Sequence, residues 1–165
     1  MPTTDLHRAM QQLFSELTDG TAERKGAYIL NSGDAGLLRS LDKLAAAEAS
    51  RGVNGGATIA AHAQHVRYGL SLMNRWATDG GNPFADAKWD EAWRISEVTE
   101  PQWEEIRHGL VGESDRWRDI LGAPRELDRV GLKGMIASIA HVAYHLGAIR
   151  QIAQQARGPK EGTFT

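Results

Sequence analysis

Two histidines, His141 and His145, stand four residues apart in an otherwise apolar stretch near the C-terminal end of the chain. In an α-helix, residues four positions apart lie one above the other, so both imidazole rings can point at one atom. Paired imidazoles of this kind are common ligands of divalent metal ions. The spacing therefore indicates a metal site, and two hydrogen-bonded core histidines are the alternative interpretation.

A second pair, His62 and His65, lies in another segment with helical periodicity. On helical wheels, all four histidines fall on the apolar faces of their segments, so packing these faces together would gather three or four imidazoles at one depth. Buried imidazoles need polar partners, because an unpaired buried polar group costs a few kcal/mol. Three histidines around one ion, with a position left open to water, is the arrangement of catalytic zinc sites.

The composition narrows the chemistry. The chain has no cysteine, which excludes disulfides, thiolate nucleophiles and Cys-ligated metals. The metalloprotease motif H-E-x-x-H is also excluded, because Val142 stands where its glutamate would follow His141. A metal ion bound by three histidines could still acidify a water molecule or polarise a bound oxygen or sulfur.

The length and charge of the chain limit its number of domains and the partners that it can bind. The 165 residues fit one domain, which we expect to span residues 1–157 and to be followed by a flexible tail at 158–165. Nineteen basic against 21 acidic side chains create no positive field for nucleic acid. The chain also lacks a long apolar segment and a signal peptide. We therefore expect a cytoplasmic protein that binds neither membrane nor nucleic acid.

The elements that must position the histidines read as helices. Apolar residues recur with helical spacing over about 4–18, 34–50, 58–77, 99–121 and 134–156. Thr58 and Thr99 are the expected N-caps of the third and fourth helices, and residues 78–101 read as a long irregular crossover. No strand-like alternation occurs. The predicted fold is all-α, most simply a four-helix bundle with an additional short helix between the first two bundle helices.

Two motifs resemble those of the DinB/YfiT-like superfamily of metal-binding helical bundles. Residues 58–66, T-I-A-A-H-A-Q-H-V, are similar to the opening of the second bundle helix of that family, and residues 141–151, H-V-A-Y-H-L-G-A-I-R-Q, to the paired-histidine motif of its last helix. The resemblance implies up-down-down-up topology, a homodimer, and one Zn²⁺, Ni²⁺ or similar ion held by His65, His141 and His145. His62 is then a neighbour of the ligands or a fourth ligand.

The resemblance also implies a range of functions. Characterised members include transferases and isomerases that use a low-molecular-weight thiol, so we expect a metal-dependent enzyme, such as a thiol-dependent S-transferase or a hydrolase, acting on a small molecule. The alternatives are a non-catalytic stress-response or ligand-binding bundle with a structural metal, and an interaction module with structural histidines. The segment 21–50 is longer than the usual link in the family, which leaves the substrate class open.

A few further residues are candidates for the site. Three tryptophans can line a cavity near the crossover: Trp76, Trp89 and Trp93. Arg150 either binds an anionic group of the substrate or pairs with a carboxylate. His7 and His108 have no partners at metal-binding spacing, so we expect them on the surface.

Overall fold

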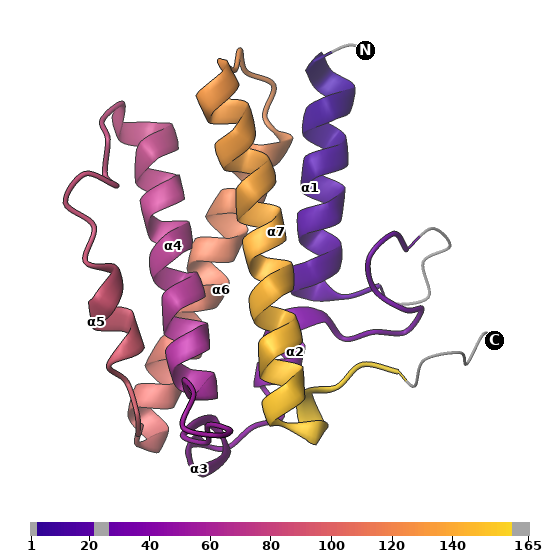
Figure 1. Ribbon diagram of the computed structural model, residues 1–165. Helices are drawn as coiled ribbons and strands as arrows, with labels where there is room; N and C mark the ends of the chain where they lie inside the picture. The colour runs from indigo at the N-terminus through magenta and orange to yellow at the C-terminus, as the bar shows by residue number, and fades with distance from the viewer. Residues whose placement is uncertain (1–2, 22–26, 160–165) are drawn as a thin grey trace.

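A computed structural model describes residues 3–21 and 27–159, and these residues form helices and loops without strands (Figure 1). Four helices are long: α1 (Thr3–Asp19), α4 (Ile59–Asp79), α6 (Glu100–Gly122) and α7 (Arg129–Ile152). The others are short: α2 (Gly36–Leu41), α3 (Ala46–Ala49), α5 (Trp89–Trp93) and the 3₁₀ turn η1 (Gln154–Ala156). The predicted all-α class is confirmed for the described part of the chain.

The four long helices surround one apolar core. Helices α4 and α1 each pack against both α6 and α7. In the view of Figure 1, α1 and α7 run downwards along the chain, whereas α4 and α6 run upwards. Each helix contributes side chains that are completely buried, among them Phe14, Val66, Trp117 and Val142. Because α4 and α7 are neighbours, the two segments that carry the histidine pairs lie side by side.

The start of α4 is held by Thr58, as its sequence predicts. The Thr58 hydroxyl accepts a hydrogen bond from the amide of Ala61 at 3.2 Å and donates one to the carbonyl of Ile95 at 2.9 Å. The first bond caps the helix, and the second ties it to the segment that follows α5. The helix ends at Asp79 and is followed by the C-cap Gly80, whose φ of 71° favours glycine. The cap determines where along the core His62 and His65 stand.

Helix α7 begins five residues earlier than predicted. Its N-cap is Asp128, whose carboxylate accepts from the amide of Gly131 at 2.7 Å. Gly122, Pro124 and Gly131 had indicated a connection over residues 122–133. Instead, Gly131 makes room for a neighbour, because a Cβ there would lie 3.1 Å from the ring of Trp76. The helix then ends at Ile152, before the 3₁₀ turn, rather than at residue 156.

Other predicted boundaries also differ from the observed ones. The helix predicted over 34–50 is two short helices, α2 and α3, and the crossover 78–101 contains α5. The N-cap predicted at Thr99 is present, and it forms part of a capping box in which Thr99 and Gln102 exchange hydrogen bonds. Part of the segment 21–50 (residues 22–26) and most of the predicted tail (160–165) lie outside the described residues. None of the described helices is long and apolar enough to cross a membrane.

His7 is buried, so its predicted surface position is wrong. Its side chain is fully enclosed between α1 and the α6–α7 connection. With its proton on Nδ1, the ring donates to the carbonyl of Leu121 at 3.0 Å, and Nε2 accepts from the amide of Arg125 at 3.3 Å. Both ring nitrogens therefore have backbone partners, which a sequence pattern does not reveal because the partners are more than a hundred residues away.

The Thr58 cap generates a stability prediction. We expect Thr58→Ala to lower the free energy of unfolding by about 1–2 kcal/mol, because the Ala61 amide and the Ile95 carbonyl both lose a partner. Urea unfolding of the metal-free protein measures this change. Thr58→Ser keeps the hydroxyl and is expected to stay within about 0.5 kcal/mol of wild type. Equal losses in the two variants would show that the methyl group, not the hydroxyl, matters.

Candidate metal centre

Four imidazole rings meet where α4 packs against α7. Helix α4 contributes His62 and His65, one turn apart, and α7 contributes His141 and His145. His145 is 1% exposed, His65 8% and His62 9%, whereas His141 is partly buried and faces a cavity. The expected convergence of two helices is thus present, with one ring of the cluster reachable from outside.

Three ring nitrogens are spaced like the ligands of one ion. His141 Nε2 lies 3.1 Å from His65 Nε2 and 3.0 Å from His145 Nε2. The ligand atoms of these three residues all lie within 4.8 Å of one another. A tetrahedral zinc ion with Zn–N distances near 2.0–2.1 Å separates its ligand nitrogens by roughly 3.3 Å. The two measured distances are close to this value, so the three nitrogens can hold one divalent ion.

The protonation of the cluster favours a cation. Burial lowers the pKa of all four histidines. In His65 and His145, burial and, to a lesser extent, the neighbouring imidazoles together lower the pKa to about 4 and about 3. Near neutral pH the rings are therefore neutral. Neutral imidazoles are the form that binds metal. In addition, the single Nε2 of His141 has only one hydrogen to share with two neighbouring nitrogens, whereas an ion satisfies all three lone pairs.

His62 lies behind one of the three candidate ligands. Its Nδ1 is 2.9 Å from Nδ1 of His145, the ring nitrogen that faces away from the three-nitrogen cluster. When the lone pair on Nε2 of His145 points into the cluster, the proton of that ring sits on Nδ1 and is donated to His62. Metal-binding histidines commonly make such a bond, which fixes the ring and its tautomer. His62 is therefore placed to orient His145.

Helix α5 covers one side of the site with two tryptophans. The ring of Trp93 stacks on His65, with centroids 4.3 Å apart and planes 27° apart, and it lies perpendicular to the ring of His62. The ring centroid of Trp89 lies 5.4 Å from that of His65. Nδ1 of His65 is buried and has no hydrogen-bond partner among the described residues, so stacking holds this ring. The sequence showed the two tryptophans, but not the short helix that turns both towards the histidines.

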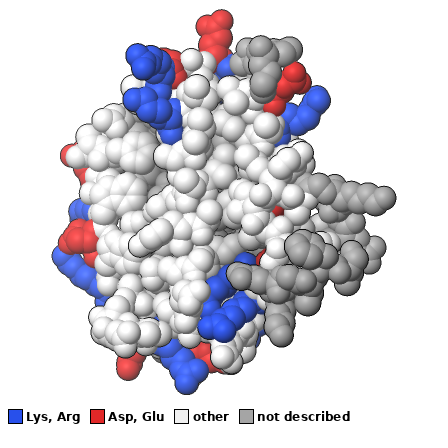
Figure 2. Space-filling model, turned by 45° about the vertical axis from the view of Figure 1, so that its right-hand side comes forward, with Lys and Arg blue, Asp and Glu red and all other residues white. Residues whose placement is uncertain are grey.

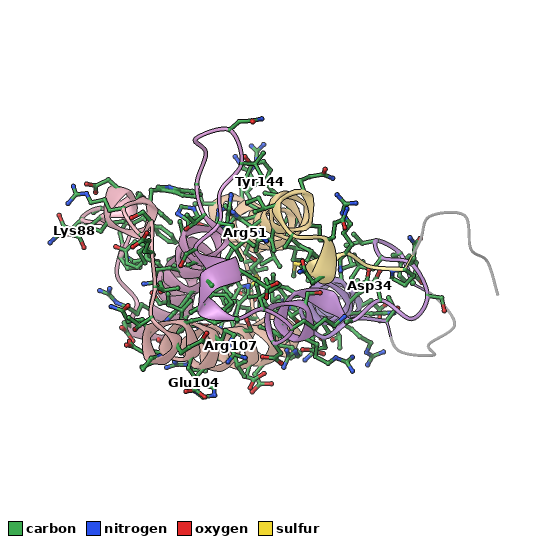
Figure 3. The ribbon with its side chains drawn as sticks, turned by 90° about the horizontal axis from the view of Figure 1, so that it is seen from below. Asp34, Arg51, Lys88, Glu104, Arg107 and Tyr144 are labelled. Atoms are coloured by element: carbon green, nitrogen blue, oxygen red, sulfur yellow. The ribbon has the colours of Figure 1, made fainter. Side chains whose placement is uncertain are left out.

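A cavity of about 510 Å³ opens beside His141, between α4 and α7. Trp76 and Trp89, two of the predicted substrate-binding residues, line it. Arg150 does not line it. Instead, Arg150 pairs with Asp34 at 2.6 Å and donates to the carbonyl of Ala156. Figure 3 shows Asp34 on the opposite side of the molecule from Lys88, which directly precedes α5.

Comparisons of the chain with protein-family models, with curated proteins and with solved structures found no match. The functional proposal therefore depends on the geometry of the site and on the chemistry of its residues.

The lowered histidine pKa values generate a pH prediction. In the unfolded chain, histidines bind protons below about pH 6.5. In the folded protein, His65 and His145 bind them only near pH 4 and 3. Between these limits the unfolded state holds more protons, so the metal-free protein should lose stability as the pH falls. Each histidine contributes up to about 1.4 kcal/mol per pH unit.

Urea unfolding at several pH values between 4 and 7 measures this slope. We expect His145→Gln to flatten it, because one of the shifted groups is removed. His108→Gln is the matched control, since His108 is exposed on α6, and it should keep the wild-type slope. A slope unchanged by His145→Gln would mean that carboxylates, not the histidine cluster, control acid stability.

Proposed function

We propose that this chain binds one divalent metal ion, Zn²⁺ or Ni²⁺, through His65, His141 and His145. The observation that carries the proposal is the meeting of three neutral Nε2 atoms from two helices, each within about 3 Å of a neighbour. No carboxylate joins this group among the residues that the structure describes. A three-nitrogen set leaves at least one coordination position for water or substrate.

We further propose that the protein is a metal-dependent enzyme, such as a low-molecular-weight-thiol-dependent S-transferase or a hydrolase. When bound, the ion supplies a Lewis acid that stabilises a thiolate or a hydroxide. The chain supplies the ligands, the His62 hydrogen bond that orients His145, and the tryptophans that shield His65 from water. The cavity beside His141 supports this proposal, because a purely structural ion needs no adjoining space for a small molecule.

Membership of the DinB/YfiT-like superfamily and its up-down-down-up four-helix bundle belong to the same proposal. The two quoted motifs fall on the two neighbouring helices that meet at the histidines, α4 and α7. The paired directions of α1 with α7 and of α4 with α6 in Figure 1 agree with that topology. A non-catalytic bundle, in which the ion only joins α4 to α7, is the alternative that the buried position of His145 favours.

A homodimer is proposed from the outer face of α7. Ile136 and Tyr144, eight residues and about two turns apart, are 50% and 69% exposed. Between Lys133 and Arg150 the helix carries no Lys, Arg, Asp or Glu. Figure 2 shows a broad area without charged side chains, with the charges gathered mainly towards its edge. A second copy of this chain, presenting the same face, would cover these side chains from water.

Metal content tests the central proposal. Wild-type protein loaded with Co²⁺ or Zn²⁺ should bind about one ion per chain, measured by elemental analysis and, for Co²⁺, by visible absorption. His145→Ala should bind none, because the two ligand nitrogens that remain are too few to hold the ion. His108→Ala should bind as much metal as wild type. A wild-type protein that stays metal-free in excess Zn²⁺ would remove the basis for the proposal.

The same assay separates the roles of the histidines and of the ion. His62→Ala should keep one ion per chain but bind it about 10–100-fold more weakly, as expected for a group that orients a ligand. Complete loss would make His62 a ligand. Added 2-mercaptoethanol should alter the Co²⁺ spectrum if a coordination position is open. An unchanged spectrum would favour the structural ion.

Light scattering tests the dimer. We expect wild type at micromolar concentration to have twice the mass of one chain, and Tyr144→Glu to be monomeric, because it places a charge in the apolar face. Val53→Glu, at an exposed position before α4, is the control and should stay dimeric. A monomeric wild type would refute the dimer without affecting the metal proposal.

A further inference from the structure

The cavity beside His141 is long, and it begins at the metal centre. It is lined by Gly69, Leu70, Met73, Trp76, Gly81, Asn82, Phe84, Trp89, Val130, Gly134, Ala137, Ser138 and His141. The lining residues of α7 run from His141 back to Val130. At 1.5 Å per residue, this is roughly 16 Å of helix. One end of the cavity is thus an imidazole of the cluster, and the other lies near the start of α7.

Two glycines keep this space open. A Cβ at Gly69 would lie 3.6 Å from Cε1 of His141 and 3.8 Å from the ring of Trp89, so a larger side chain would fill the passage between these rings. A Cβ at Gly134 would lie 3.7 Å from the terminal methyl of Met73. Neither glycine has a positive φ. These two positions therefore favour glycine because a side chain would fill the cavity, not because of the backbone conformation.

The walls of the cavity offer apolar contacts and few free polar groups. None of its lining side chains, all within the described residues, is charged. The Ser138 hydroxyl already accepts from Nε1 of Trp117 and donates to the carbonyl of Met135. The side-chain oxygen of Asn82 accepts from the amide of Phe84. A charged group that entered would lose hydration without meeting a side chain of opposite charge.

Aromatic rings form much of the wall. Trp89 and Phe84 stand nearly parallel, with their planes 16° apart, and Trp76 is packed against Gly131. Flat apolar groups gain both burial and ring contacts beside such surfaces. Pockets of a few hundred cubic ångströms with this type of lining bind small molecules in other proteins.

We infer that this cavity holds an uncharged aromatic or alkyl group of the substrate, with a single polar head directed past His141 to the metal. The inference rests on the proposed function and adds to it a substrate class: an elongated neutral molecule rather than a charged or sugar-like one. Gly69, Gly134 and Ala137 determine the width of the space, and Trp76 and Trp89 contact the apolar group.

Two thiols, 2-naphthylmethanethiol and 2-mercaptoethanol, separate binding in the cavity from binding to the metal. Both bind a Co²⁺ ion through sulfur, and a sulfur-to-cobalt absorption band reports this binding. Only the naphthyl thiol has an apolar group that can fill the cavity. We expect the naphthyl thiol to half-saturate the wild-type Co²⁺ protein at a concentration at least tenfold lower than the concentration of 2-mercaptoethanol that does so. The anionic 2-mercaptoethanesulfonate should bind no more tightly than 2-mercaptoethanol.

Matched variants place this preference in the cavity. Ala137 lines the cavity but is exposed, so Ala137→Phe narrows the space without disturbing the core. It should reduce the naphthyl advantage to less than threefold and leave 2-mercaptoethanol unaffected. Gly134→Leu should act in the same way. Val111→Phe adds a ring at an exposed position of α6, outside the lining and outside the α7 face, and should behave as wild type. An advantage that survives Ala137→Phe and Gly134→Leu overturns the inference.

A measurement without metal keeps this test separate from the proposed function. Calorimetry with 2-naphthalenemethanol and metal-free protein should show binding to wild type and to Val111→Phe, and none to Ala137→Phe. If this pattern is found while no thiol alters the Co²⁺ spectrum, the cavity assignment stands and the open coordination position is refuted. If 2-mercaptoethanol alters the spectrum but naphthyl compounds show no preference, the cavity assignment is refuted and the metal proposal stands.

Discussion

The packing of α4 against α7 brings four imidazole rings into an apolar interior, and the character of the site follows from how these rings are satisfied. Burial keeps them neutral, so their nitrogens are lone-pair donors near neutral pH. Hydrogen bonds satisfy only part of the set, because His141 Nε2 faces two other nitrogens. A cation shared by His65, His141 and His145 resolves this conflict, and His62 then has a defined role as the acceptor that orients His145.

The surroundings of the cluster differ on its two sides. On one side, Trp93 of α5 stacks on His65 and limits the approach of water. On the other side, His141 opens onto an apolar cavity between the same two helices. This asymmetry favours a site that receives a ligand over an ion that only joins helices. The contact between α4 and α7 thus brings together the three histidines of the proposed metal site and the cavity beside His141.

Much of the framework was predictable from local rules. Helical spacing located all four long helices, and Thr58 and Thr99 marked the starts of α4 and α6, because N-caps depend on residues within one turn. The failures have specific causes. The start of α7 was missed because Gly131 serves contact with Trp76 rather than a turn. His7 was misplaced because its partners, Leu121 and Arg125, are distant in sequence. The helix α5 was too short for a periodic pattern.

The sequence by itself determined the helical class, the absence of cysteine ligands and cysteine nucleophiles, and the stacking of each histidine pair on one helical face, since all of these depend on composition or on neighbours within two turns. Only the tertiary structure decided which nitrogens meet. The register of α4 against α7 sets His62 behind His145 and His65 beside His141, and it results from the packing of many core side chains. The pairing of Arg150 with Asp34 and the empty volume beside His141 were decided in the same way, because both depend on segments far apart in the chain.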